Sequence, residues 1–205
     1  MARDTHSIVK MSRREGYALH PKAHKALAKR TNAPGQAAGG RMRNKPSQYA
    51  LQLREKQKVK RLYGLLEKQF SNLMAEASRT PGQSGATLLQ YLERRLDNTV
   101  YRAGFAPSRR AARQLVTHGH FILNGRRVDV PSIRVREGDV IELRAHSKAN
   151  EYFKKLDDTS PAPSATPAWQ TVDRKKINIK VTGKPARDDA EQDINEQLIV
   201  EYYSR

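Results

Sequence analysis

Cysteine is absent from this sequence of 205 residues, and aromatic residues make up only 6 % of it. Without cysteine, the chain can form neither a disulfide nor a zinc site built on thiolates. No apolar run approaches the roughly 20 residues of a membrane-spanning helix. The N-terminal stretch MARDTHSIVKMSRREG lacks the apolar segment of a secretory signal. These absences lead us to expect a soluble intracellular protein.

Acidic residues are scarce relative to basic ones. The chain has 21 Asp and Glu against 39 Lys and Arg, which gives a net charge of +18. A charge of this size predicts a polyanionic partner, either nucleic acid or an anionic membrane surface. The first 61 residues hold 16 of the 39 basic residues and only 3 of the 21 acidic ones. Such asymmetry is typical of a basic arm attached to a folded body.

Signatures of catalysis and of cofactor binding are missing as well. The sequence has no GxxxxGK[ST] and no GxGxxG after a strand. His20 and His24 lie four residues apart, but no third ligand follows at a useful spacing, so we expect no metal and no cofactor. Arg95-Leu96-Asp97 matches the catalytic motif of pseudouridine synthases, yet no catalytic domain follows it. We interpret Asp97 as a structural carboxylate in the middle of a helix, and we expect neither enzymatic activity nor a small-molecule substrate.

The basic N-terminal extension, residues 1–46, has few large apolar residues and many Gly and Pro in TNAPGQAAGGRMRNKP. It cannot build much core alone, so either it orders only on a partner or it is a solvated flexible tail. Ser47 then begins helical periodicity, with Gly64 as a stop. Leu51 and Leu62 could face a core there. We expect helices over residues 47–64, 65–79, 86–104 and 109–118.

The helix over 109–118 separates its charge from its apolar residues. Ser108 is a good N-cap and Gly119 a good C-cap. At about 100° per residue, three arginines, Gln114 and Thr117 share one face. The opposite face carries Ala111, Ala112, Leu115 and Val116. One side of this helix therefore suits a core and the other suits anions.

The second half of the chain is expected to form an antiparallel sheet. Asn124-Gly125 between apolar runs is a strong hairpin signal within 120–130. Further strands are expected over 138–144, 169–173 and 176–183, on either side of a Pro-rich connector at 157–168. The terminal segment 193–205 carries an apolar run that needs a docking site. The predicted class is thus α+β: a helical domain plus an RNA-binding module of helices packed on an antiparallel sheet.

Arginine suits phosphate because its planar fork donates two hydrogen bonds at once. The scarcity of aromatic residues argues against base stacking on single strands, and favours a surface that reads phosphates of folded RNA. A merely solvated charged face is the alternative. The predicted RNA-binding residues are Arg13, Arg14, Arg41, Arg43, Lys45, Arg54, Lys58, Arg61, Arg94, Arg95, Arg102, Ser108, Arg109, Arg110, Arg113, Gln114, His118, His120, Asn124, Arg126 and Arg127.

The segment RLDNTVYRAGFAPSRRAARQLVTHGHFILNGRRVDVPS closely resembles the RNA-binding module named after ribosomal protein four of the small subunit. Several RNA-modifying enzymes and a tyrosyl-tRNA synthetase also carry that module. Other segments, KMSRREG, APGQ, YALQLREKQKVKRLYGLLEKQF, PAWQTVD and INEQLIVEYYSR, resemble the bacterial or organellar ribosomal protein itself. The resemblance covers almost the whole chain.

This resemblance implies a division into the extension 1–46, ordered on RNA, a helical domain 47–90 completed by 190–205, and the module 91–189. It implies a structural constituent that binds small-subunit rRNA at a multi-helix junction of the 5′ domain and nucleates assembly. It also implies a loop with Arg41, Arg43 and Lys45 where messenger RNA enters, beside small-subunit proteins three and five, with roles in accuracy and autoregulation. The location would be the ribosome of the cytoplasm, or of an organellar stroma or matrix. Some relatives bind zinc through N-terminal cysteines, which this chain lacks.

A chain of this composition could have either of two other functions. A free-standing RNA-modifying or RNA-salvage factor could have borrowed the module. A membrane-surface protein would need an amphipathic helix with a large apolar face in the extension, and we expect none in residues 1–46.

Overall fold

The computed structural model describes residues 4–30, 32–35, 46–163 and 165–204. The chain divides into two compact units. The helical unit comprises Met1–Leu88 and Asp193–Arg205, and the mixed unit comprises Leu89–Gln192. Helices and one antiparallel sheet together confirm the α+β class.

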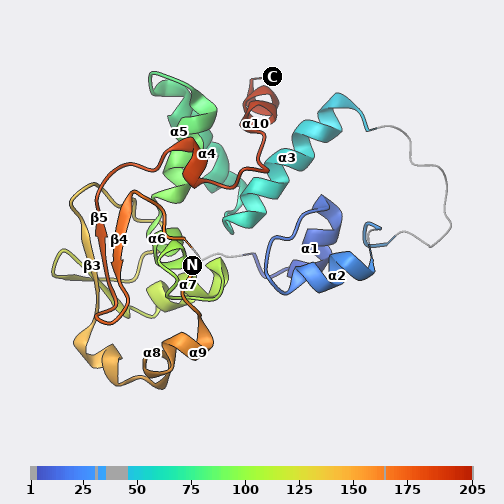
Figure 1. The fold of residues 1–205 in the computed structure, drawn as a ribbon. Helices are drawn as coiled ribbons and strands as arrows, with labels where there is room; N and C mark the ends of the chain where they lie inside the picture. Colours follow the sequence, from blue (N-terminus) through green and yellow to red (C-terminus); the bar gives the residue numbers. More distant parts are fainter. Residues whose placement is uncertain (1–3, 31, 36–45, 164, 205) are drawn as a thin grey trace. The chain divides into compact units, whose positions relative to one another are not determined.

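The helical unit is built from α1 (Ile8–Glu15), α2 (Ala23–Lys29), α3 (Gln48–Leu62), α4 (Glu67–Arg79), the start of α5 (Ser84–Glu93) and α10 (Glu196–Tyr203) (Figure 1). Val59, Phe70 and Ala77 are fully buried in its core. α10 packs along α3 and buries Ile199 completely, so the apolar C-terminal run has its docking site.

Helix α3 starts as predicted but turns a different face inward. The Ser47 hydroxyl accepts a hydrogen bond from the Ala50 amide at 3.3 Å, which confirms the cap. The expectation that Leu51 faces a core is wrong, because Leu51 is 42 % exposed. Its place is taken by Gln52 and Lys56, both buried. Lys56 can be buried because its ammonium lies 4.4 Å from the centre of the Tyr202 ring and 2.6 Å from Glu67 Oε1.

The N-terminal extension contains more secondary structure than its composition indicated. α1 packs on α3, and Met11 and Leu19 are buried. Glu15 ties the two helices together through ion pairs with Arg54, at 3.2 Å, and with Arg61. The view that residues 1–46 lack an amphipathic helix is therefore wrong for α1, whose apolar side faces protein.

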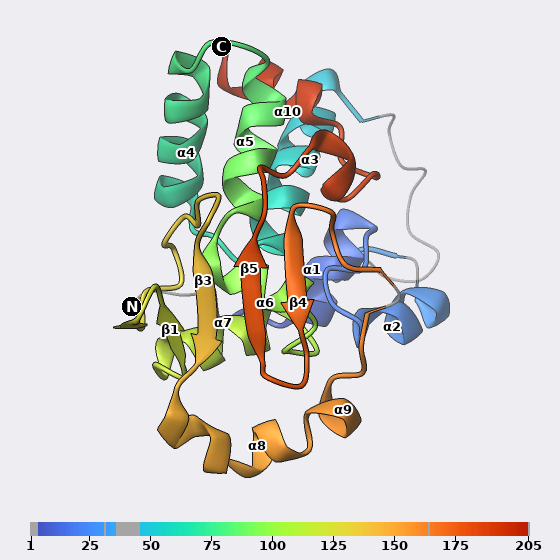
Figure 2. The same ribbon diagram turned by 60° about the vertical axis from the view of Figure 1, so that its left-hand side comes forward.

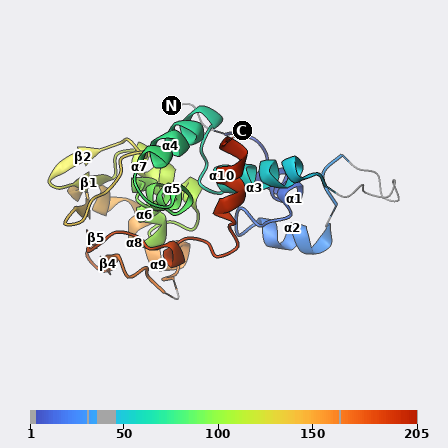
Figure 3. The same cartoon turned by 90° about the horizontal axis from the view of Figure 1, so that it is seen from above.

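The mixed unit carries a five-stranded antiparallel sheet in the order β2-β1-β3-β5-β4 (Figure 2). Its strands are β1 (Phe121–Leu123), β2 (Arg126–Val128), β3 (Val140–Leu143), β4 (Gln170–Asp173) and β5 (Asn178–Val181). α6 (Leu96–Arg102) and α7 (Arg109–Thr117) cover one face of the sheet (Figures 2 and 3). Short helices occupy the connections: η1 (Ala145–Ala149), α8 (Glu151–Lys154), α9 (Leu156–Thr159) and η2 (Arg187–Asp189). Leu96, Ala112 and Val116 pack against Phe121 and Ile141 in the core.

The predicted continuous helix over 86–104 is wrong, because the chain breaks between α5 and α6. At the break, Arg94 accepts from the amide of Val135 (2.8 Å), and the amide of Leu96 donates to Ile133 (2.8 Å). The backbone of Arg94–Leu96 thus pairs with a distant extended segment instead of continuing the helix. Asp97 consequently lies in the first turn of α6 and not in the middle of a helix.

The hairpin prediction is confirmed. Asn124 and Gly125 have φ values of 49° and 79°, as a two-residue turn with left-handed positions requires. Asn124 also braces the sheet, since its Oδ1 accepts from the Val140 amide (2.9 Å) and its Nδ2 donates to Asp139 (2.8 Å).

Candidate nucleic-acid interface

Helix α7 presents its cationic side away from the core, as its sequence predicts. The Ser108 hydroxyl accepts from the Ala111 amide at 3.3 Å and caps the helix. Ala112 and Val116 are fully buried, while Arg110 and Gln114 are exposed. Ser108 is itself buried, so the structure shows it as the cap of α7 and not as an exposed group.

Arg109 is held in a fixed position at the start of α7. Its Nε donates to Asn98 Oδ1 and its Nη2 donates to Glu191 Oε1, each at 2.9 Å. Its guanidinium also lies 4.6 Å from the centre of the Tyr101 ring. Three contacts therefore preorganise this arginine before any RNA is present.

Glu93 is the buried anchor of the same network. Its carboxylate, with 1 % of the side chain exposed, accepts two hydrogen bonds from Arg102, at 2.8 and 3.0 Å. It also accepts from Asn98 Nδ2 at 2.8 Å. Because Asn98 in turn holds Arg109, one buried carboxylate orients two cationic side chains.

Arg95 does not lie on the surface that its place in the sequence indicated. It is 5 % exposed and makes a two-point ion pair with Asp97, at 2.9 and 3.1 Å. Nη1 of Arg113 lies 3.4 Å from Oδ2 of Asp97, the same oxygen that accepts from Nη2 of Arg95. We correct the prediction for Arg95: its guanidinium neutralises a buried carboxylate, because the break at Arg94–Arg95 turns it inward. Asp97 is a structural carboxylate of the module.

The hairpin lies beside the end of α7. Gly119 has φ of 70°, and a Cβ placed on it would come 2.7 Å from Nε of Arg127. The Arg127 side chain therefore crosses directly over Gly119. Arg126, Arg127 and His118 are exposed, whereas His120 is half-buried. Arg127 of β2 thus lies beside the C-terminal end of α7, while the clustering of its charge with the arginines of that helix stays a prediction.

The remaining predicted residues of the mixed unit serve the fold as well. Arg94 donates from Nε to the Val135 carbonyl at 2.8 Å. Burial, with the charge of Arg134 nearby, lowers the pKa of Arg94 from its usual value. Asn124 is committed to the two hydrogen bonds that brace the hairpin.

In the helical unit, several predicted RNA contacts bind protein groups. Arg54 and Arg61 pair with Glu15, and burial raises the pKa of Glu15 although both arginines oppose the shift. Lys58 donates to the Asp193 carbonyl at 2.7 Å and pairs with Glu55 at 2.8 Å. Arg13 donates to the Asn32 carbonyl at 2.8 Å.

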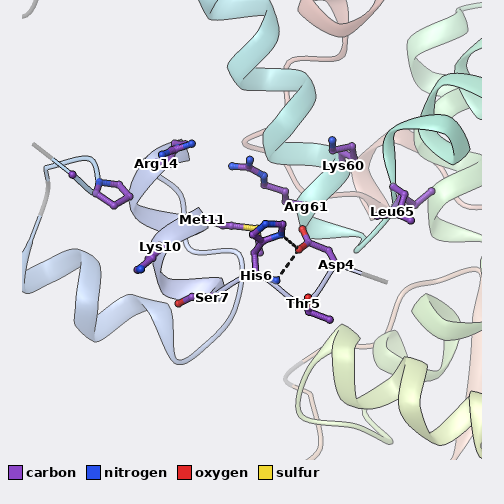
Figure 4. A pocket seen from close by; sticks show the side chains of 13 residues that line it. Asp4, Thr5, His6, Ser7, Lys10, Met11, Arg14, Lys60, Arg61 and Leu65 are labelled. Carbon is purple, nitrogen blue, oxygen red and sulfur yellow. Dashed lines mark hydrogen bonds and ion pairs between the residues drawn. The ribbon is translucent and has the colours of Figure 1, made fainter. Parts of the chain in front are cut away.

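A cavity of about 740 Å³ lies where α1 faces the end of α3 (Figure 4). Arg14 and Arg61 line it together with Lys10 and Lys60, which sequence reasoning missed. His6 and Asp4 form a 2.7 Å contact in the same cavity. Lys10 carried no signal in the sequence beyond its charge, because only the packing of α1 on α3 brings it near Lys60.

Arg41, Arg43 and Lys45 lie outside the residues that the structure describes. His20 precedes α2 and accepts from the Lys22 amide at 3.1 Å, so it does not share a helical face with His24. Within the described ranges, no group of three potential ligand side chains could hold a metal ion. Nor does any described helix combine the length and apolar composition that crossing a bilayer requires.

A helix with outward arginines, packed on a sheet whose edge is a cationic hairpin, defines a small α+β nucleic-acid-binding module. Comparison with known families agrees. Residues 3–93 match the "Ribosomal protein S4/S9 N-terminal domain" and residues 94–141 match the "S4 domain". The two matches meet at the break between α5 and α6.

Known proteins that align over the whole chain belong to the same family. The chain is 52 % identical over 206 residues to the small ribosomal subunit protein uS4 of Chlorobium luteolum. It is 49 % identical over 211 residues to the proteins of that name from Herpetosiphon aurantiacus and Clostridioides difficile. Each alignment covers 100 % of both chains. The chain belongs to the ribosomal protein uS4 family.

Proposed function

We propose that this chain is a structural, RNA-binding protein of the small ribosomal subunit and that it has no catalytic role. The observation that carries the proposal is the preorganised cationic surface of α7 and β2 in a chain of this family. A bacterial-type member of the family works in the cytoplasm, in translation.

The finer role follows from the resemblance noted in the sequence. The partner is small-subunit rRNA at a multi-helix junction of its 5′ domain, and binding there nucleates assembly of the subunit body. The extension 1–46 takes its final form on that RNA, and the segment with Arg41, Arg43 and Lys45 contributes where messenger RNA enters, beside proteins three and five. Roles in accuracy and in repression of its own messenger belong to the same proposal.

The ordered arginines of the mixed unit support the proposal that the chain binds RNA phosphates. Arginines held by Glu93, Asn98 and Asp97 lose little conformational entropy on binding, because their side chains are already ordered. Each phosphate that they neutralise releases counterions, so log K falls by about 0.9 per contact for each unit of log salt concentration on a duplex.

The direct test is binding of the full chain to an rRNA junction fragment at increasing salt. We expect a steep loss of affinity for the native chain. R110E and R126E change exposed positions, so each should weaken binding and lower the salt slope by about one while leaving the fold unchanged. K175E, which alters an exposed position of the same unit after β4, is the matched control. A flat salt response of the native chain is incompatible with the proposal.

The alternative of a free-standing RNA-modifying factor is separated by co-sedimentation. A ribosomal protein remains stoichiometric with small subunits after a moderate-salt wash, whereas a modifying factor is lost. The surroundings of Asp97 also argue against an RNA-modifying factor. Asp97 is 5 % exposed and paired with Arg95, so its carboxylate is not open to a base that would be modified.

A further inference from the structure

A hollow of about 380 Å³ lies in the mixed unit, between the end of α7 and η1. The side chains that give it its character are His118, His120, Arg144, His146, Ser147 and Asn150. No carboxylate is among the described residues that line it. Three imidazoles, a guanidinium, a hydroxyl and an amide without a carboxylate among them offer hydrogen-bond donors that suit an oxyanion.

The position of His120 is fixed from two sides. One ring nitrogen, Nδ1, lies 3.0 Å from Ser147 Oγ. The ring packs edge-on against Phe153, with 5.4 Å between centroids. The Arg144 amide donates to the His120 carbonyl at 2.8 Å, so the start of η1 is tied to the strand end that carries this histidine. The second ring nitrogen remains for a ligand.

The groups that surround His120 are cationic or neutral. His118, from the end of α7, lies 6.0 Å away between ring centroids. Arg144 and His146 come from the other wall of the hollow, and Phe153 from α8 supplies only apolar contact. Burial lowers the pKa of His120, and the charges of His118 and Arg144 add to this effect. Without an anion in place, the hollow therefore resists a further positive charge.

We propose that this hollow binds one backbone phosphate of RNA and that protonation of its histidines controls how tightly. A bound phosphate would favour the charged imidazoles, so phosphate and protons bind together and affinity rises as the pH falls. The arginines of α7 and β2 stay charged throughout this pH range. The proposal rests on the proposed function and adds a proton-dependent contact to it.

The test is the affinity of the full chain for the rRNA junction fragment between about pH 5.5 and 8, the range in which histidine titrates. Ionic strength is held constant. H118Q/H146Q removes two exposed imidazoles and leaves the packed His120 in place, so the fold should persist. H24Q changes an exposed histidine of α2 and is the matched control. We expect the native chain and H24Q to bind about tenfold more tightly at the acid end than at the alkaline end, which corresponds to an average uptake of about 0.4 proton on binding across this range. The affinity of the double variant should change far less.

Equal pH dependence in the native chain and the double variant, or none in the native chain, overturns the histidine contact while the proposed function stands. Absence of binding at every pH and salt concentration instead overturns the proposed function itself. Histidine NMR signals distinguish the source of the phosphate. Shifts of the His118 signal on adding the RNA fragment support the proposal, and shifts with inorganic phosphate alone, but not with RNA, contradict it.

Discussion

Arg109 donates from Nη2 to Oε1 of Glu191 at 2.9 Å, and Nη2 of Arg102 lies 3.5 Å from the same oxygen. Glu191 is thus a counter-ion for two arginines, supplied by the segment that follows η2. Its side chain is 28 % exposed, against 13 % for Arg109. A carboxylate with this geometry occupies a position that a phosphate oxygen could take, and Asn98 and Tyr101 would still hold Arg109 in its absence.

E191Q should therefore strengthen RNA binding. We expect affinity for an rRNA junction fragment to rise about two- to fivefold, the size of a partly exposed ion pair. The salt slope should steepen by about one, because one more arginine becomes available to phosphate. E151Q, on exposed Glu151 of α8, removes the same charge outside this network and controls for net charge. Weaker binding by E191Q, or a gain no larger than that of E151Q, would show that Glu191 only maintains the fold.

Gly119 offers a second test of how α7 and the hairpin cooperate. G119A places a methyl group 2.7 Å from the Arg127 guanidinium, at a residue with φ of 70°. The left-handed backbone costs about 1 kcal/mol of stability for a residue with a Cβ. Because the guanidinium must also move, we expect RNA affinity to fall.

G138A is the matched control for that backbone cost. Gly138 has φ of 87° and open space around its Cβ position, so the same strain arises without displacing a side chain. Thermal unfolding should report similar losses for both variants, and RNA titration should separate them. If G119A binds RNA as well as G138A does, Arg127 has no part in recognition.

Local chemistry made much of this fold predictable. The caps at Ser47 and Ser108 and the turn at Asn124-Gly125 act within a few residues, so their signals lie in the sequence itself. The break between α5 and α6 gives no such signal, since neither Gly nor Pro marks it. It arises from pairing with a segment about 40 residues further on.

The same distinction explains the site. The helical wheel of α7 correctly separates Ala112 and Val116 from Arg110, because periodicity is local. It could not show that Arg109 meets a carboxylate 82 residues away. The sequence also could not show that Arg95 forms an ion pair with Asp97, because that pair depends on where the chain breaks between α5 and α6. Charge counts therefore overestimate the number of arginines on the protein surface.

Glu93 should be a stability residue and only indirectly a binding residue. E93Q removes a buried negative charge that accepts from Arg102 and Asn98. We expect a loss of about 2–4 kcal/mol in the free energy of unfolding, less than for a wholly buried pair because Arg102 keeps some solvent contact. Denaturant titration measures it, with E137Q at an exposed position as control. Stability equal to that of E137Q would mean that the pair gains nothing over its desolvation.

The lowered pKa of Glu67 predicts how the stability of the helical unit changes with acid. Burial opposes its ionisation, but hydrogen bonds from Lys56, Lys60 and Tyr203 outweigh burial and lower its pKa to about 2. Since the pKa of Glu67 in the folded chain lies below the usual glutamate value of 4.5, ionised Glu67 stabilises the fold above about pH 4.5. That contribution is lost as the pH falls from about 4.5 towards 2, when Glu67 becomes protonated and releases Lys56 and Tyr203.

E67Q should remove this pH dependence. At neutral pH the variant should be less stable than the native chain. The difference should shrink towards pH 2 and vanish below it, where native Glu67 is also neutral. Because Tyr203 donates to Glu67 at 2.9 Å, its ring signal in NMR reports directly on whether α10 stays docked. E76Q, at an exposed position of the same helix, should leave the acid transition unchanged. A difference between E67Q and the native chain that is constant from pH 7 to pH 2 would show that the carboxylate charge does not hold α10 in place.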